Sequence, residues 1–147
     1  MSFDHGHKYT LQNVPQKTPL YGVTITGLKG SGVKFVRIQS VDWTNQIRVR
    51  VVPIAYFEKL LDSSRPGVTV AKCVLGMVFL ELVEGFSGVG EYLYAIDMNT
   101  IRLCPYAPGH ASVQGFFEEK APIPGPDKQL SVSVGLCPRT TLQRIVK

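Results

Sequence analysis

Residues 34–53 read KFVRIQSVDWTNQIRVRVVP. Two runs rich in β-branched and aromatic residues flank the polar segment 42–46, whose Asp and Asn favour a turn. This pattern predicts an antiparallel β-hairpin. Side chains alternate between the two faces of a strand, so the second run should carry Ile47, Val49 and Val51 on one face and Arg48 and Arg50 on the other. One face of the hairpin is therefore expected to pack, and the other to meet solvent or a partner.

A helix is expected directly after this hairpin. Apolar residues recur at helical spacing over 54–61, behind a proline that suits a first helical turn. The helix should end near Arg65, because the residue before a proline resists the α conformation. Strand-like composition then returns in four segments, at 68–70, 74–83, 91–96 and 112–118. A hairpin, a helix and further strands together predict an α+β domain.

The composition divides the chain into three segments. Residues 1–32 hold prolines, glycines and few apolar residues, and are expected to be a partly disordered leader. Residues 33–136 are expected to form the folded domain. Residues 137–147 begin an amphipathic helix that lacks a C-cap glycine; its apolar stripe is Leu142, Ile145 and Val146. We expect this helix to start a junction toward a further domain and to be poorly anchored in the isolated chain.

Length and composition exclude several classes of protein. A chain of 147 residues suits one domain, and its 44% hydrophobic and 18% charged residues argue against disorder and against a coiled coil. No run approaches the ~18 apolar residues of a membrane span, and residues 4–8 are too polar to begin a signal peptide. The three widely spaced cysteines indicate reduced thiols, as in a cytoplasmic protein.

The positive charge of the chain is concentrated in its first half. Residues 1–65 contain nine Lys or Arg and four Asp or Glu, whereas residues 66–147 contain seven of each kind. Basic proteins bind nucleic acid through phosphate, with release of counterions. Here, however, basic runs never exceed two residues and the arginines are not interleaved with aromatic residues. A solvated basic face is therefore favoured over a nucleic-acid-binding β-barrel.

The residue types of catalytic and metal centres do not gather in this sequence. His5 and His7 lie in the predicted leader, and His110 lies in a Pro/Gly-rich loop without an acidic neighbour. Cys73 follows Lys72 in an apolar context, where a packed thiol is more common than a reactive one. We therefore assign neither a catalytic residue nor a metal ligand to this chain.

Several segments between residues 33 and 147 occur together in a recognisable order. The hairpin and its helix come first, followed by a loop that opens at Gly67. EYLYAIDMNTIRLCPY then stands at 91–106, a strand at 113–118, and CPRTTLQRI at 137–145. In this order the segments resemble the N-terminal domain of the glutamine synthetase family. That family has a Pro-Asp-x-x-Thr-x-Arg-x-x-Pro-Trp signature and a Pro-Arg-x-x-Leu-x-Arg junction, and the junction here is closest to fungal glutamine-synthetase-like proteins. The matching residues are Asp42, Asp97, Thr100, Arg102, Pro105 and Arg139.

The resemblance implies a β-grasp fold, in which a mixed sheet packs on one main helix. The family ligates ammonia to glutamate with ATP and Mg²⁺ or Mn²⁺, and its metal ligands and nucleotide pocket lie in a larger catalytic domain beyond this sequence. Its N-terminal domain packs against a neighbouring subunit and closes that subunit's active site. The resemblance thus implies homo-oligomeric partners and no catalysis or cofactor in this chain alone. The candidate inter-subunit residues are Arg48 and Arg50 of the hairpin, and Gly67, Ala71, Lys72 and Cys73 of the loop 67–76.

The sequence departs from the family in this same loop. The family's Gly-x-x-Phe-Asp-Gly-Ser-Ser is replaced by GVTVAKCV at 67–74, so Ala71 stands in place of a carboxylate that helps to hold ammonium, with Lys72 beside it. A cation site without its anion is expected to bind ammonium weakly. The signature's proline and tryptophan are replaced by Ile96 and Tyr106. Ligation of another amine and a non-catalytic role both stay open. The alternative is a stand-alone β-grasp protein repurposed as a binding module or small biosynthetic accessory enzyme.

Overall fold

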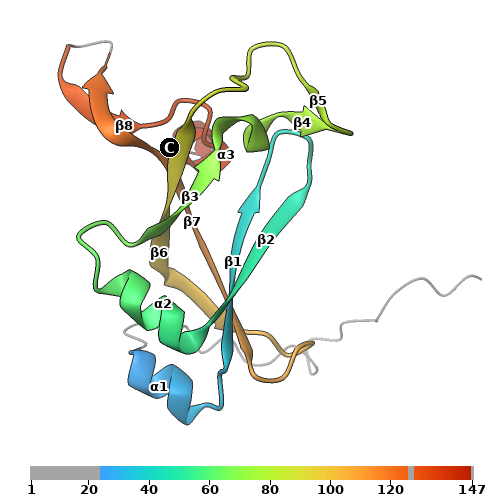
Figure 1. Cartoon of the computed structure of the whole chain (residues 1–147), viewed down its shortest axis with the longest axis vertical. Helices are drawn as coiled ribbons and strands as arrows, with labels where there is room; N and C mark the ends of the chain where they lie inside the picture. The colour runs from blue at the N-terminus through green and yellow to red at the C-terminus, as the bar shows by residue number, and fades with distance from the viewer. Residues whose placement is uncertain (1–23, 126–127, 147) are drawn as a thin grey trace, which may run out of the picture.

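The computed structural model describes residues 24–125 and 128–146. Its main feature is a mixed sheet in the order β2-β1-β7-β6-β3, with β8 paired to β7 (Figure 1). β1 and β7 run parallel, and the other neighbours run antiparallel. The strands of this sheet are β1 (Phe35–Val41), β2 (Ile47–Pro53), β3 (Gly67–Ala71), β6 (Glu91–Leu103), β7 (His110–Pro124) and β8 (Leu130–Ser133). The expected α+β class with a mixed sheet is confirmed.

Short helices and a small second hairpin complete the described part of the chain. These elements are α1 (Ile25–Gly30), α2 (Ile54–Leu61), the 3-10 helix η1 (Lys72–Leu75), β4 (Met77–Val78), β5 (Glu81–Leu82) and α3 (Pro138–Val146). The predicted first hairpin and the helix after it are confirmed, since β1 pairs with β2 from Phe35↔Pro53 to Val41↔Ile47 and α2 follows at once. None of the helices described is long and apolar enough to cross a bilayer.

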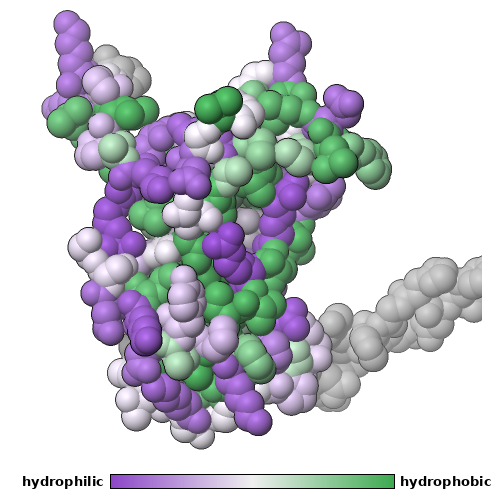
Figure 2. Space-filling view, viewed as in Figure 1, coloured by the Kyte–Doolittle hydropathy of each residue, from purple (hydrophilic) through white to green (hydrophobic). Residues whose placement is uncertain are grey.

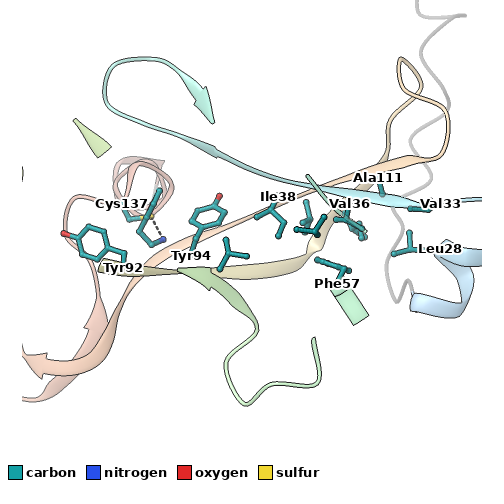
Figure 3. Packing of buried hydrophobic residues seen from close by; sticks show 14 of the residues in the cluster. Leu28, Val33, Val36, Ile38, Phe57, Tyr92, Tyr94, Ala111 and Cys137 are labelled. Atoms are coloured by element: carbon teal, nitrogen blue, oxygen red, sulfur yellow. Dashed lines mark hydrogen bonds between the residues drawn. The ribbon is translucent and has the colours of Figure 1, made fainter. Parts of the chain in front are cut away.

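The hydrophobic core lies on the face of the sheet that α2 covers. It forms an elongated row from Tyr92 and Cys137 at one end, past Tyr94, to Leu28 at the other (Figure 3). Phe57 of α2 is fully buried in this row, which makes α2 the main helix of the fold. The core also extends upstream of the expected domain start at residue 33, because Leu28 of α1 is 1% exposed. Most of the predicted leader, residues 1–23, lies outside the described residues.

The face of the sheet away from α2, here called the outer face, carries the apolar row of β2. The predicted alternation is present, but Arg48 and Arg50 share the core side with the buried Val52. The apolar row is instead exposed, by 68% for Ile47 and about 45% for Val49 and Val51. The start of α3 lies against the outer face, behind the sheet in Figure 1. Tyr106 also covers part of this face, because its ring lies 5.8 Å from the guanidinium of Arg37, which is opposite Val51 in the ladder.

The sheet splits toward one end. β1 and β7 pair only from Phe35↔His110 to Ile38↔Val113, although both strands continue, and beyond that point they diverge (Figure 1). The Tyr94 hydroxyl bridges the split, since it donates to the Gln39 carbonyl at 2.7 Å and accepts from Gly115 N at 2.8 Å. Burial raises the pKa of Tyr94 to about 12, so this hydroxyl keeps its proton at neutral pH.

Three predicted segments have a different structure. Residues 74–83, expected as one strand, form the end of η1 and the β4–β5 hairpin. β6 and β7 continue through the regions expected to be irregular at 97–103 and 121–124, and β8 follows. His110, expected in a loop, begins β7 and stacks on Phe35 with ring centroids 5.1 Å apart. In β6 and β7 the long sheet pairing provides hydrogen-bond partners for segments that contain weak strand formers.

Candidate functional site

Two of the predicted inter-subunit residues, Arg48 and Arg50, line a groove of about 150 Å³ at the split end of the sheet. The other four belong to β3 and η1, which border the groove, but their own side chains are not part of its lining. The β1–β2 hairpin forms one wall, and β3, η1 and Tyr94 form the other. The groove therefore occupies the space that opens where the two halves of the sheet diverge. Its apolar walls come from Ile38, Val68, Val70 and Val74, and its polar groups include Arg48 and Arg50.

The Arg48 guanidinium is held by hydrogen bonds at the turn of the first hairpin. Its Nε donates to Asp42 Oδ2 at 2.7 Å, and its Nη2 donates to the Met77 carbonyl at 3.2 Å. Asp42 Oδ1 also accepts from Thr44 N at 2.9 Å, Thr44 Oγ1 at 2.7 Å and Gln46 N at 3.0 Å. Burial raises the pKa of Asp42, but these hydrogen bonds outweigh it and hold the pKa below its usual value. The charges of Asp42 and Arg48 thus compensate each other.

Arg50 is the cation that the groove can offer to a partner. It lies opposite Ile38 in the β1–β2 ladder and is exposed. Within residues 24–125 and 128–146 its guanidinium has no hydrogen-bond, ion-pair or ring partner. Arg48 and Arg50 look equivalent in the sequence, and only the position of Asp42 distinguishes them.

The loop residues differ in what they contribute. Gly67 allows β3 to approach β6, because a Cβ there would lie 2.7 Å from the Tyr94 carbonyl oxygen. Lys72 Nζ lies 3.0 Å from both carboxylate oxygens of Glu119 and 4.5 Å from the Tyr92 ring centroid, so its charge is balanced. Ala71 ends β3 opposite Glu91, and Cys73 is a half-buried unpaired thiol in η1.

The signature residues lie on the other side of the split and fix the start of α3. The β6–β7 register shifts between Asp97 and Arg102, and Thr100 Oγ1 stabilises this bulge by donating to Asp97 O at 2.7 Å and accepting from Gln114 N at 2.8 Å. Arg139 Nη2 lies 3.2 Å from Asp97 Oδ2, its Nη1 donates to Gly115 O at 3.1 Å, and its guanidinium stacks on Phe116. Arg102 bonds nearby carbonyls and Pro105 follows β6. These residues hold the fold together and leave no free nucleophile or base.

The described residues do not form a metal centre. No three His, Cys, Asp or Glu side chains come together in residues 24–125 and 128–146, and His5 and His7 lie outside this part of the chain. Divalent cations such as Mg²⁺ need several converging oxygen ligands. The groups present therefore do not fit the cation that the family uses, and we derive no chemical step through one.

Two important residues of this end had no signal in the sequence. Tyr94 is 55 positions from Gln39 and 21 from Gly115, and Glu119 is 47 positions from Lys72. A single sequence shows local spacing only. Contacts between residues more than 20 positions apart can therefore be identified only in the folded chain.

Comparison with known proteins agrees with this architecture. The chain is 27% identical over 135 residues to type-1 glutamine synthetase 1 of Dictyostelium discoideum. It is similar to part of a glutamine synthetase. The similarity covers 88% of this chain but only 26% of the relative, so the chain spans about a quarter of that protein's length. No protein-family model matches the sequence.

One solved structure of GmaS shares the fold. The structure described as apo GmaS without ligand has a TM-score of 0.51 and 14% identity, and covers 67% of this chain and 21% of GmaS. A GmaS complex with ADP has a TM-score of 0.49 and 15% identity, and covers 65% of this chain and 20% of GmaS. At such low identity the first match supports the fold alone. Together with the relative above, it agrees with an N-terminal glutamine synthetase-like domain.

Proposed function

We propose that this chain is the N-terminal domain of a glutamine synthetase-like protein, which packs against neighbouring subunits and closes their active sites. The observation that carries the proposal is the sequence similarity, because it extends over nearly the whole chain and yet over a quarter of the relative. The remaining length of such a protein would supply the catalytic domain, with ATP and Mg²⁺ or Mn²⁺ as its cofactors, in the cytoplasm.

Two exposed apolar surfaces support a role in assembly. The first is the stripe of α3, where Leu142, Ile145 and Val146 are 60–77% exposed and the described helix buries no residue. The second is the outer face, with Ile47 at its edge. Contiguous exposed apolar residues mark interaction surfaces in proteins of this size. We therefore assign the α3 stripe to contact with the catalytic domain and the outer face to contact with a neighbouring subunit.

A chimera tests this assignment. This chain replaces the matched segment of the Dictyostelium relative, and light scattering measures the number of subunits. We expect the chimera to assemble to the subunit number of the parent. Leu142→Asp with Ile145→Asp should reduce it to smaller species, because a domain that is not docked on its catalytic domain cannot present its outer face to the neighbouring subunit. In the isolated chain the same double change should alter the unfolding free energy by less than about 0.5 kcal/mol, because both side chains are exposed. A chimera that is folded by circular dichroism yet unassembled would contradict the proposal and favour a stand-alone binding module.

A further inference from the structure

The β4–β5 hairpin ends in two bulky apolar residues that face solvent. Phe79 and Leu80, here called the tip, are 94% and 91% exposed. Both have positive φ, 46° and 69°, the conformation that a two-residue hairpin turn normally gives to Asn-Gly. Large side chains are disfavoured in this left-handed region. In Figure 2, hydrophobic residues project at the edge where Figure 1 shows β4 and β5. The tip is thus a costly arrangement that serves no packing within the described residues.

The base of this hairpin is firmly held. The Phe86 ring lies so close to Gly76 that an added Cβ would be 2.3 Å from it. Val83 N donates to the Gly76 carbonyl at 2.9 Å, and Arg48 reaches the Met77 carbonyl on the other side. The tip is therefore presented on a fixed support, which lowers the conformational entropy that a partner must remove.

The charge around the tip limits what can receive it. Glu81 and Glu84 are the only charged residues in the segment 76–90. Two carboxylates beside an apolar tip disfavour an anionic membrane or a nucleic acid, both of which attract basic segments. They favour an apolar recess with a basic rim.

The groove of this same chain has that chemistry. Its walls are aliphatic, its unneutralised charge is Arg50, and its volume of about 150 Å³ is that of a cavity that accepts one benzene-sized ring. The tip and the groove lie at the same end of the molecule but on separate elements. The tip is acidic and the groove is basic, so their charges favour contact between the tip of one copy and the groove of another.

We propose that the tip of one copy inserts Phe79 into the Arg50-rimmed groove of a second copy, with Glu81 or Glu84 facing Arg50. The contact joins two different surfaces, so it is head-to-tail and can propagate around a ring. This contact would be one of the contacts between subunits proposed above, and its biological role rests on that proposed function. Both surfaces nevertheless lie in this chain, so the contact can be tested without a catalytic domain.

Sedimentation velocity of the isolated chain at 10 µM to 1 mM tests the contact. A small interface binds weakly, so we expect the average mass to rise with concentration, with a dissociation constant of about 10 µM to 1 mM. Phe79→Asn with Leu80→Gly should abolish the rise while keeping the fold at least as stable, because Asn-Gly suits the turn. Arg50→Glu should abolish it as well. Arg144→Glu is the matched control, because Arg144 borders a separate pocket near β8, and it should leave the association unchanged.

Mixing the two inactive variants gives the sharper result. The Phe79→Asn/Leu80→Gly protein keeps an intact groove, and the Arg50→Glu protein keeps an intact tip, so a mixture should form a 1:1 complex that neither forms alone. A wild-type chain that stays monomeric at 1 mM, or a mixture that stays monomeric, would overturn the contact. Loss of association in Arg144→Glu but not in Arg50→Glu would also overturn it. If the chain is monomeric while the chimera described above assembles, only this contact fails; if the chain associates while the folded chimera does not assemble, only the proposed function fails.

Discussion

Replacement of Gly115 by alanine is expected to lower the free energy of unfolding by about 3 kcal/mol or more, the upper range for overpacking. A Cβ at this position would lie 2.0 Å from the Ala95 carbonyl oxygen and 3.1 Å from Tyr94 Cε1. β6 cannot easily move away from β7 here, because Ala95 is also paired on its other side with Gly67 of β3. Separating β6 and β7 would also disturb the bond from Gly115 N to Tyr94 and the bond from Arg139 to Gly115 O.

Urea unfolding followed by circular dichroism measures this effect. Gly135→Ala is the matched control, since no atom lies within 4 Å of its added Cβ and its φ is not positive. We expect Gly135→Ala to stay within about 0.5 kcal/mol of wild type. Equal urea midpoints for the two variants would contradict the close approach of β6 and β7 at Gly115.

Phe57→Ala is expected to cost about 3–5 kcal/mol, as large aromatic truncations in protein cores do. Phe57 is 0% exposed, is the buried residue of α2 and lies in the core row (Figure 3). Its loss would leave a cavity between α2 and the sheet that the surrounding strands cannot fill.

Thermal and urea unfolding of Phe57→Ala should be compared with Tyr56→Ala. Tyr56 precedes Phe57 on the same helix but is 53% exposed, so its truncation should cost no more than about 1 kcal/mol. A larger loss for Tyr56→Ala than for Phe57→Ala would mean that α2 presents a different face to the sheet.

The local elements could be predicted from the sequence because their signals are local. The hairpin follows from period-two alternation around Asp42, and α2 follows from helical spacing behind Pro53. The β4–β5 hairpin was missed because its turn is Phe79-Leu80, which carries no Gly, Pro, Asn or Asp. The sequence also could not show which face of β2 is buried. Alternation assigns the side chains to two faces, but it does not say which face meets the core and which meets solvent.

The candidate site was predictable only in part, because most of its contacts join residues that are far apart in the sequence. Arg48 and Arg50 were singled out by position, yet only folding brings Asp42 to Arg48 and leaves Arg50 unpaired among the described residues. Asp97 and Arg139 were singled out separately by the family resemblance, and their contact across 42 positions was not predicted. Gly115 carries no local signal at all, because it is the neighbouring strand β6 that leaves no room for a side chain at this position.

The central claim is that the exposed apolar stripe of α3 is covered in the full assembly by a glutamine synthetase-type catalytic domain. Amide hydrogen exchange of residues 140–146 tests it directly, in the isolated chain and in the chimera with the Dictyostelium relative. We expect fast exchange in the isolated chain, where the described helix buries no residue, and at least about 100-fold slower exchange in the chimera. Equal exchange rates in the two proteins would contradict it.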